Sequence, residues 1–176
     1  MKKIALALLI CIGFASLAQA TDLTSLTQAS NLNNRWAGLY AGVTGGYGFD
    51  GAGKGINGGA LLGFNYQPTP WLVTGAEADL SAGANGWMGT VRGRLGVPVS
   101  SFLVYGTGGL AYGGAYSATF MSPLELSDVS VGWAAGAGVE YALTQNWSVR
   151  GEWLYYDLGQ QQVIGNTARL ALTYKF

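Results

Sequence analysis

The sequence has no histidine, and its one cysteine, Cys11, lies in the first apolar stretch. Histidine is the side chain best suited to proton transfer near neutral pH, and with cysteine it supplies the common zinc ligands. We therefore predict no catalytic, cofactor-binding or metal-binding residue and no cofactor. Glu77 and Asp79 could in principle work as an acid and a base, but two arginines in the next predicted strand favour ion pairing instead.

Charge is also scarce. Charged residues make up 10% of the chain, whereas an ordinary soluble domain has roughly 25%. The chain carries 9 basic and 9 acidic residues and no basic patch. Nucleic acid is therefore not a predicted partner.

The N-terminus predicts a secretory signal over residues 1–20. A charged start, "MKK", precedes the apolar run "IALALLICIGFASLA" and the small-residue site "AQA". The run is shorter than the roughly 20 residues of a membrane-spanning helix, and no other stretch comes close. Ile10 before Cys11 disfavours a lipoprotein anchor, which needs a small residue there. Polar residues 21–34 predict a flexible lead-in, which leaves residues 35–176 as the folded domain.

Glycine and aromatic residues are abundant: the chain has 29 glycines, 6 tryptophans, 10 tyrosines and 6 phenylalanines. They occur in segments where apolar and polar residues alternate, which is typical of β-strands. Strands of this length suit tilted bilayer crossings of roughly 9 to 11 residues. Eight are predicted, near residues 35–49, 56–67, 71–82, 87–97, 102–116, 129–143, 147–158 and 166–176.

The connections between these strands alternate in length. Residues 68–70, 98–101 and 144–146 are short, whereas most of the others are longer, with 83–86 as a tight exception. Short turns at one end, longer loops at the other and an even strand number are typical of outer-membrane barrels. The predicted fold class is therefore all-β, an eight-stranded antiparallel transmembrane up-and-down β-barrel.

Charged residues occupy one parity of their strands, the glycine-rich and polar one. A lysine or arginine that faces lipid at the bilayer midplane costs roughly 2 to 4 kcal/mol, so this parity should face the lumen. The residues predicted to form lumen ion pairs are Glu77, Asp79, Arg92, Arg94, Glu140, Arg150, Glu152, Arg169 and Lys175. Residues 102–116 carry no charge, and their two faces stay unassigned.

Strand register supports the pairing of these charges. Folding the third and fourth strands over their short loop places Glu77 opposite Arg92. Folding the sixth and seventh strands in the same way places Glu140 opposite Arg150. Directly opposed residues interact across an antiparallel pair, so two hairpins independently bring opposite charges together.

Tryptophans mark the starts of four predicted strands. Amphipathic rings favour the membrane–water interface, which predicts interface positions. The residues are Trp36, Trp71, Trp87 and Trp147. The alternative, turn-flanking core residues of a soluble sandwich, would require the glycine-rich, sparsely charged face to serve as a solvent surface.

Several segments carry a family resemblance that covers most of residues 35–176. They include "RWAGLYAGVTGGYGF", "GGALLGFNYQ", "GAEADL", "GTVRGRLG", "YGTGGLAYG", "GWAAGAGVEYALTQNWSVRGEWLYYDLG" and the terminal "YKF". Together they resemble the small porin-like outer-membrane immunogenic proteins of Gram-negative bacteria, relatives of the OmpA-type eight-stranded barrel.

The resemblance implies an integral protein of the cell outer membrane. The expected partners are outer-membrane lipid, lipopolysaccharide, periplasmic chaperones and the outer-membrane assembly machinery. In that family the terminal aromatic strand is read by the assembly machinery, which implies that Leu170, Leu172, Tyr174 and Phe176 form the assembly signal. The oligomeric state is not predicted.

Three functions follow as hypotheses. An eight-stranded barrel has a lumen that side chains roughly fill, which favours a non-enzymatic, structural, surface-exposed barrel. The first alternative is a small passive pore, because glycines such as Gly63, Gly75 and Gly96 leave room on the inward face. The second is a surface interaction protein that acts through its loops, chiefly residues 117–128.

Overall fold

The computed structural model describes residues 35–49, 54–83, 86–115, 130–159 and 163–176. The predicted signal, the lead-in and the 117–128 loop lie outside these residues. Within them, no helix is long and apolar enough to cross a membrane.

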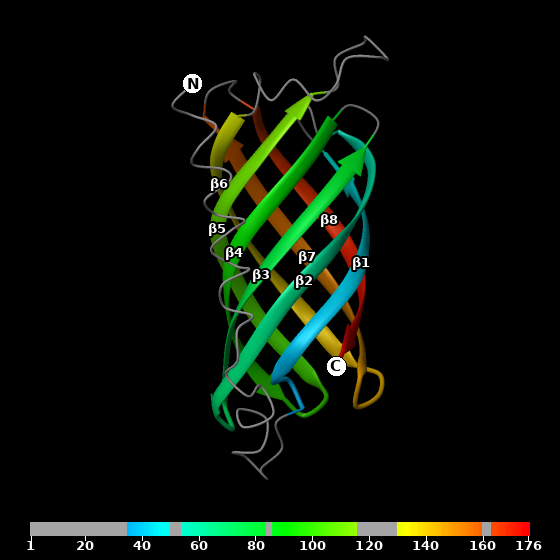
Figure 1. Ribbon diagram of the computed structural model, residues 1–176, viewed down its shortest axis with the longest axis vertical. Helices are drawn as coiled ribbons and strands as arrows, with labels where there is room; N and C mark the ends of the chain where they lie inside the picture. The colour runs from blue at the N-terminus through cyan, green and yellow to red at the C-terminus, as the bar shows by residue number, and fades with distance from the viewer. Residues whose placement is uncertain (1–34, 50–53, 84–85, 116–129, 160–162) are drawn as a thin grey trace, which may run out of the picture. The chain divides into compact units, whose positions relative to one another are not determined.

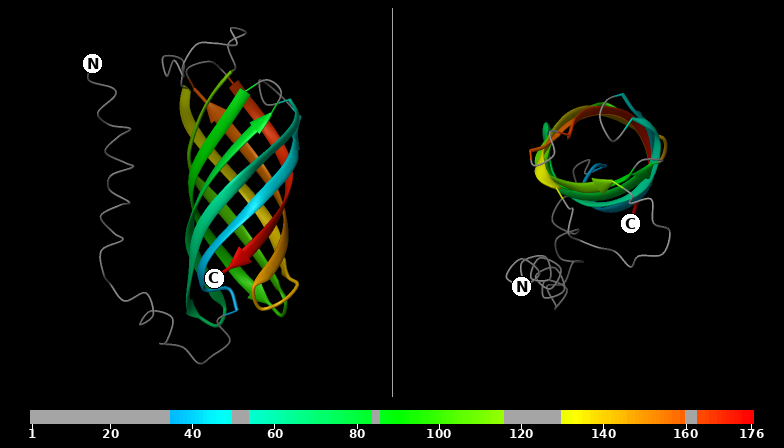
Figure 2. Two further views of the ribbon diagram at one scale, coloured as in Figure 1. Left: turned by 45° about the vertical axis from the view of Figure 1, so that its right-hand side comes forward. Right: turned by 90° about the horizontal axis from the view of Figure 1, so that it is seen from above.

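Eight strands close into an antiparallel barrel (Figure 1), which confirms the predicted fold class. Each strand pairs with the next, and the first pairs with the last, so the sheet has no open edge (Figure 2). The strands are β1 (Gly38–Gly48), β2 (Gly55–Thr69), β3 (Leu72–Gly83), β4 (Gly86–Val99), β5 (Phe102–Ala115), β6 (Ser130–Ala142), β7 (Trp147–Leu158) and β8 (Val163–Lys175).

The C-terminus and the connections β2–β3, β4–β5 and β6–β7 lie at one end of the barrel, here called the turn end. The opposite end is called the loop end. In the β6–β7 turn, the backbone N–H groups of Asn146 and Trp147 donate to the Thr144 hydroxyl at 3.2 and 3.0 Å. In outer-membrane barrels the short turns lie on the periplasmic side.

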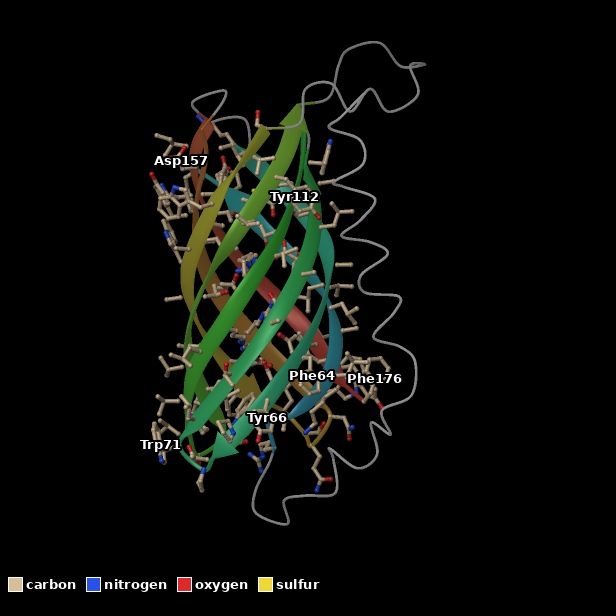
Figure 3. All side chains as sticks on the ribbon, turned by 60° about the vertical axis from the view of Figure 1, so that its left-hand side comes forward. Phe64, Tyr66, Trp71, Tyr112, Asp157 and Phe176 are labelled. Carbon is tan, nitrogen blue, oxygen red and sulfur yellow. The ribbon has the colours of Figure 1, made fainter. Side chains whose placement is uncertain are left out.

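Side-chain exposure is the reverse of a soluble protein. Large apolar residues are exposed on the outer wall, such as Leu170 at 66% and Val43 at 61%, whereas eight charged residues are buried inside. Figure 3 shows side chains projecting outward around the wall, with Trp71 and Phe176 near the turn end and Tyr112 near the loop end. A barrel with this polarity is suited to a hydrocarbon surrounding.

The faces of β5, which its own sequence left unassigned, are set by its neighbours. Leu103 aligns with the inward-facing Glu140 of β6 and is fully buried, and Tyr105 follows on the same parity. Val104 and Leu110 lie on the other parity and are exposed on the outer wall. Pairing therefore resolves what composition could not.

Tyrosine rings inside the barrel lie over glycines of the adjacent strand. An added Cβ at each of these glycines would overlap the ring, so only glycine leaves the space that the tyrosine fills. Aromatic residues shield strand glycines in other sheets in the same way. The directly paired residues are Tyr40 with Gly63, Tyr105 with Gly138, and Tyr156 with Gly165.

The chain before β1 departs from the prediction. Residues 35–37 are not part of a strand, because the chain turns at Gly38, whose φ is 127°. Trp36 is 5% exposed and packs inside the turn end. Its predicted interface position is therefore wrong: the turn carries the ring into the lumen instead of along the wall. Figure 2 (right) shows this blue segment within the outline of the ring.

The other three predicted interface tryptophans lie on the outer wall. Trp71 is 64% exposed and Trp147 is 43% exposed at the turn end, while Trp87 contacts Tyr112 near the loop end with ring centroids 6.0 Å apart. Further ring pairs lie near both ends: Trp147–Tyr174, Tyr174–Phe176, Phe102–Tyr141, Trp133–Tyr155 and Phe49–Trp153.

Candidate functional site

Eight charged side chains meet in the middle of the lumen, each no more than 5% exposed. Four are arginines and four are carboxylates, so the group has no net charge. We call it the lumen ion network: Glu77 and Asp79 from β3, Arg92 and Arg94 from β4, Glu140 from β6, Arg150 and Glu152 from β7, and Arg169 from β8.

Arg92 is the centre of the network. Its guanidinium nitrogens lie 2.8 Å from Glu77, 2.7 Å from Asp79 and 2.7 Å from Glu152. Its Nε donates to the Thr90 hydroxyl at 2.8 Å, and that hydroxyl donates to Asp79 at 2.5 Å. The predicted register of Glu77 opposite Arg92 is confirmed. One guanidinium thus joins carboxylates from two strands on different sides of the barrel.

Arg150 binds across the lumen to Glu77. Two of its nitrogens reach the two carboxylate oxygens, at 2.6 and 2.8 Å, and the Tyr40 hydroxyl donates to the same carboxylate at 2.8 Å. The register of Glu140 opposite Arg150 is as predicted, but the two residues have other ion-pair partners. In a narrow lumen, long arginine side chains reach the opposite wall as easily as the neighbouring strand.

Arg94 pairs with Glu140 at the turn-end side of the network. Its guanidinium also lies over the Tyr105 ring, 3.8 Å from the centroid, in a cation–π arrangement. The Tyr105 hydroxyl donates to Glu152 at 2.6 Å. Ser148 donates a further hydrogen bond to Glu140 at 2.5 Å, so this carboxylate has more than one partner.

Arg169 completes the network from β8, with nitrogens 3.1 Å from Asp79 and 2.8 Å from Glu152. Lys175 was predicted to belong with these charges, but it lies apart from them. It is the last residue of β8, is partly exposed, and its ammonium donates to the Arg35 carbonyl oxygen at 2.5 Å. Its parity is inward, yet its position at the end of the strand places it at the mouth of the barrel.

Tyr40, Tyr105 and Thr90 are members of the site that the sequence analysis did not single out. Thr90 shares the parity of Arg92 and Arg94 on β4, so the same parity rule could have found it. Tyr40 lies opposite the inward-facing Gly63 of β2. Tyr105 lies in the uncharged strand, where parity alone had no reference. The hydroxyls of Tyr40, Tyr105 and Thr90 donate to network carboxylates, which can accept further hydrogen bonds beside those from the arginines.

Chemically, the network is a set of cross-strand links that tie five of the eight strands together. Buried charges must be paired and hydrogen-bonded, and removing one partner of such a pair typically costs about 3 to 5 kcal/mol. Within the described residues, no group of three or more His, Cys, Asp or Glu side chains could hold a metal ion. The arrangement is suited to closing the lumen.

A closed barrel with an apolar outer wall and an ionic interior defines an integral outer-membrane β-barrel protein. Residues 5–176 match the family described as "Outer membrane protein beta-barrel domain", and the chain belongs to this family. The "31 kDa outer-membrane immunogenic protein" of Brucella melitensis is 33% identical over 228 aligned residues, which cover 93% of this chain and 95% of that protein. The "22 kDa outer membrane protein" of Rhizobium leguminosarum is 36% identical, and the alignment covers 69% of this chain and 64% of that protein.

Solved structures with low sequence identity share the fold. The N-terminal β-barrel domain of Pseudomonas aeruginosa OprF superimposes with a TM-score of 0.58 at 14% identity, covering 80% of this chain and 98% of that domain. The outer membrane enzyme PagL gives a TM-score of 0.50 at 13% identity, covering 78% and 99%. The family and its relatives place this protein in the outer membrane, whereas the fold alone does not decide between enzymes and structural barrels.

Proposed function

We propose that this protein is a non-enzymatic, structural barrel of the outer membrane whose lumen does not conduct solutes. The observation that carries the proposal is the lumen ion network. Its central guanidinium, on Arg92, holds three carboxylates within 2.8 Å, and its eight members are buried. A solute would have to break several of these pairs at once to pass.

The glycines that favoured a pore do not leave the lumen open. A Cβ at Gly63 would meet the Tyr40 ring, and one at Gly96 would meet Leu103 and Tyr105. The space beside these glycines is therefore occupied by neighbouring side chains. This argues for the filled lumen over the diffusion channel.

Conductance across planar lipid bilayers tests the proposal. The folded protein is expected to give no large, reproducible open state. The paired variant R92S/E152S removes one cation and one anion, keeps the network neutral and shortens two central side chains, so it should conduct more than the parent. The matched control V139A, on the outer wall, should behave as the parent. A large, stable open state of the unsubstituted protein would overturn the proposal.

The absence of histidine supports the non-enzymatic part. The carboxylates of the network are held by arginines, so none is presented as a free general base. Purified, folded protein should therefore release no fatty acid from phospholipid or lipopolysaccharide esters. Sustained hydrolysis that copurifies with the heat-modifiable barrel would count against this part alone.

We also propose that the end of β8 is the signal read by the outer-membrane assembly machinery. Leu170, Leu172, Tyr174 and Phe176 alternate on the outer wall and are 37% to 71% exposed. In cells, F176S should lower the amount of protein in the outer-membrane fraction several-fold, while F176Y should retain it. Equal refolding of both variants into lipid vesicles would separate recognition from stability. Unchanged cellular yield of F176S would refute the assignment.

The N-terminal assignments stand as part of the same proposal. Residues 1–20 are proposed to be cleaved on export and residues 21–34 to be the lead-in to the barrel. Lipid and lipopolysaccharide would surround the outer wall, and periplasmic chaperones would receive the unfolded chain. Mass determination of the protein purified from outer membranes should give a chain that starts at Thr21.

A further inference from the structure

A segment that precedes β1 folds into the turn end of the barrel. Residues 35–37 turn inward at Gly38, whose φ is 127°. Residues other than glycine rarely adopt this backbone conformation. A Cβ at this position would lie 3.5 Å from Lys175 Cγ, which is ordinary van der Waals contact. The need for glycine here is therefore a matter of backbone conformation, not of space.

Trp36 fills an apolar socket in the lumen below the ion network. The ring is 5% exposed, and the residues that form the socket are inward-facing members of three strands. They are Val73 of β3, Leu103 and Tyr105 of β5, and Ala142 of β6. Trp71 and Trp147, at the same end, are exposed on the outer wall instead.

Two polar contacts fasten the same segment to the rim. The Arg35 guanidinium donates to the Ser101 hydroxyl at 3.0 Å in the β4–β5 turn. The Lys175 ammonium, at the end of β8, donates to the Arg35 carbonyl oxygen at 2.5 Å. These partners are 66 and 140 residues away in sequence, so the segment is held from two separate parts of the rim.

We propose that residues 35–37 form a stopper that closes the periplasmic mouth of the barrel, with Trp36 as its core and Gly38 as its hinge. The stopper is a second closure, separate from the ion network. It reduces the periplasmic mouth to a hollow of about 20 Å³ that Trp36, Tyr40 and Glu140 help to line, and so restricts the access of water to the network. This goes beyond the proposed function, because a barrel plugged by the network alone would not conduct either.

Cysteine labelling tests the stopper directly. In a full-length C11S background, Val73 is replaced by cysteine, since it is fully buried in the same cluster as Trp36 and close to cysteine in size. A water-soluble maleimide should label V73C slowly in folded protein. Adding W36A should raise the labelling rate at least ten-fold, whereas adding W71A, the removal of an exposed ring at the same end, should leave it unchanged.

A second reporter separates opening of the mouth from general loosening. A111C lies on the loop-end side of the network and is also fully buried, so its labelling should stay slow in the W36A protein. G38A, which strains the hinge, should raise V73C labelling, and G45A, an outward glycine with open space around it, should not. Heat-modifiable gel mobility verifies that each variant is folded.

Each labelling result either supports or overturns the stopper. Faster labelling of V73C alone supports the stopper. Rapid labelling of V73C in the parent, no change with W36A, or faster labelling of both reporters overturns it, because the ring would then be no barrier or only a general stabiliser. Conductance of the parent tests the proposed function independently, so the two can fail separately.

Discussion

Replacing Arg92 by methionine is the sharpest test of how the lumen is held together. The side chain is fully buried, and its loss leaves four carboxylates facing three guanidinium groups. Breaking a buried ion pair by removing one partner costs about 3 to 5 kcal/mol. Glu77 keeps Arg150, and Asp79 and Glu152 keep Arg169, so the lower value is expected.

A loss of about 3 kcal/mol lowers the ratio of folded to unfolded barrel by roughly two orders of magnitude. With a urea m-value of about 2 kcal/mol/M, the unfolding midpoint should fall by about 1.5 M. The measurement is a urea titration of protein folded in lipid vesicles, followed by gel mobility and tryptophan fluorescence. Reversibility is verified by approaching each urea concentration from both the folded and the unfolded side.

The paired variant R92M/D79N provides the control. It removes one charge of each sign, and the network is neutral again with three arginines and three carboxylates. It should recover at least half of the stability that R92M loses, because the uncompensated buried charge is the main cost. A loss below about 1 kcal/mol for R92M, or no recovery in the double variant, would refute an interior held by charge balance.

Other substitutions test the wall and the packing by the same urea titration. L170R, in the middle of the outer wall, should cost roughly 2 to 4 kcal/mol, while L143R at the turn end should cost about 0 to 1. G132A places a methyl group against the backbone of β7 and should cost about 1 to 3 kcal/mol, whereas G45A, with open space around it, should change stability by less than about 0.5. Y105F removes a hydroxyl that donates to a network carboxylate and should cost about 1 to 3 kcal/mol. Equal effects of L170R and L143R would contradict the positions assigned to them along the outer wall, and equal effects of G132A and G45A would contradict the close packing at Gly132.

The strands and most of their inward and outward faces could be predicted from sequence, because a charged side chain that faces lipid is costly. Charge on one parity identifies the lumen face, and hairpin length then fixes which residues oppose each other, as with Glu77 and Arg92. β5 carries no charge, so its faces could be assigned only once its neighbours had positioned it. The residue pattern of a strand predicts its faces where placing its side chains toward lipid or toward the lumen differs in free energy. It does not predict them where the two placements cost the same.

The ion pairs themselves were harder to predict than the register. Glu140 and Arg150 are opposed as expected, yet each pairs with a residue elsewhere in the barrel. Which partner wins depends on the reach of long side chains across a lumen whose width is set by all eight strands together. Trp36 was misplaced for a related reason. A period of two could be extended back through the residues before β1, but it does not reveal a backbone turn at Gly38.

The tyrosine rings seated over glycines bear on how the strands find one another. A register shift of two residues keeps every side chain on its proper face, so the alternation of apolar and polar residues does not disfavour it. Sliding β1 against β2 by that amount would bring Tyr40 over Leu61, a buried side chain, or over Asn65, in place of Gly63. Each tyrosine–glycine pair thus disfavours a two-residue register shift between neighbouring strands, which the hydrophobic pattern alone does not.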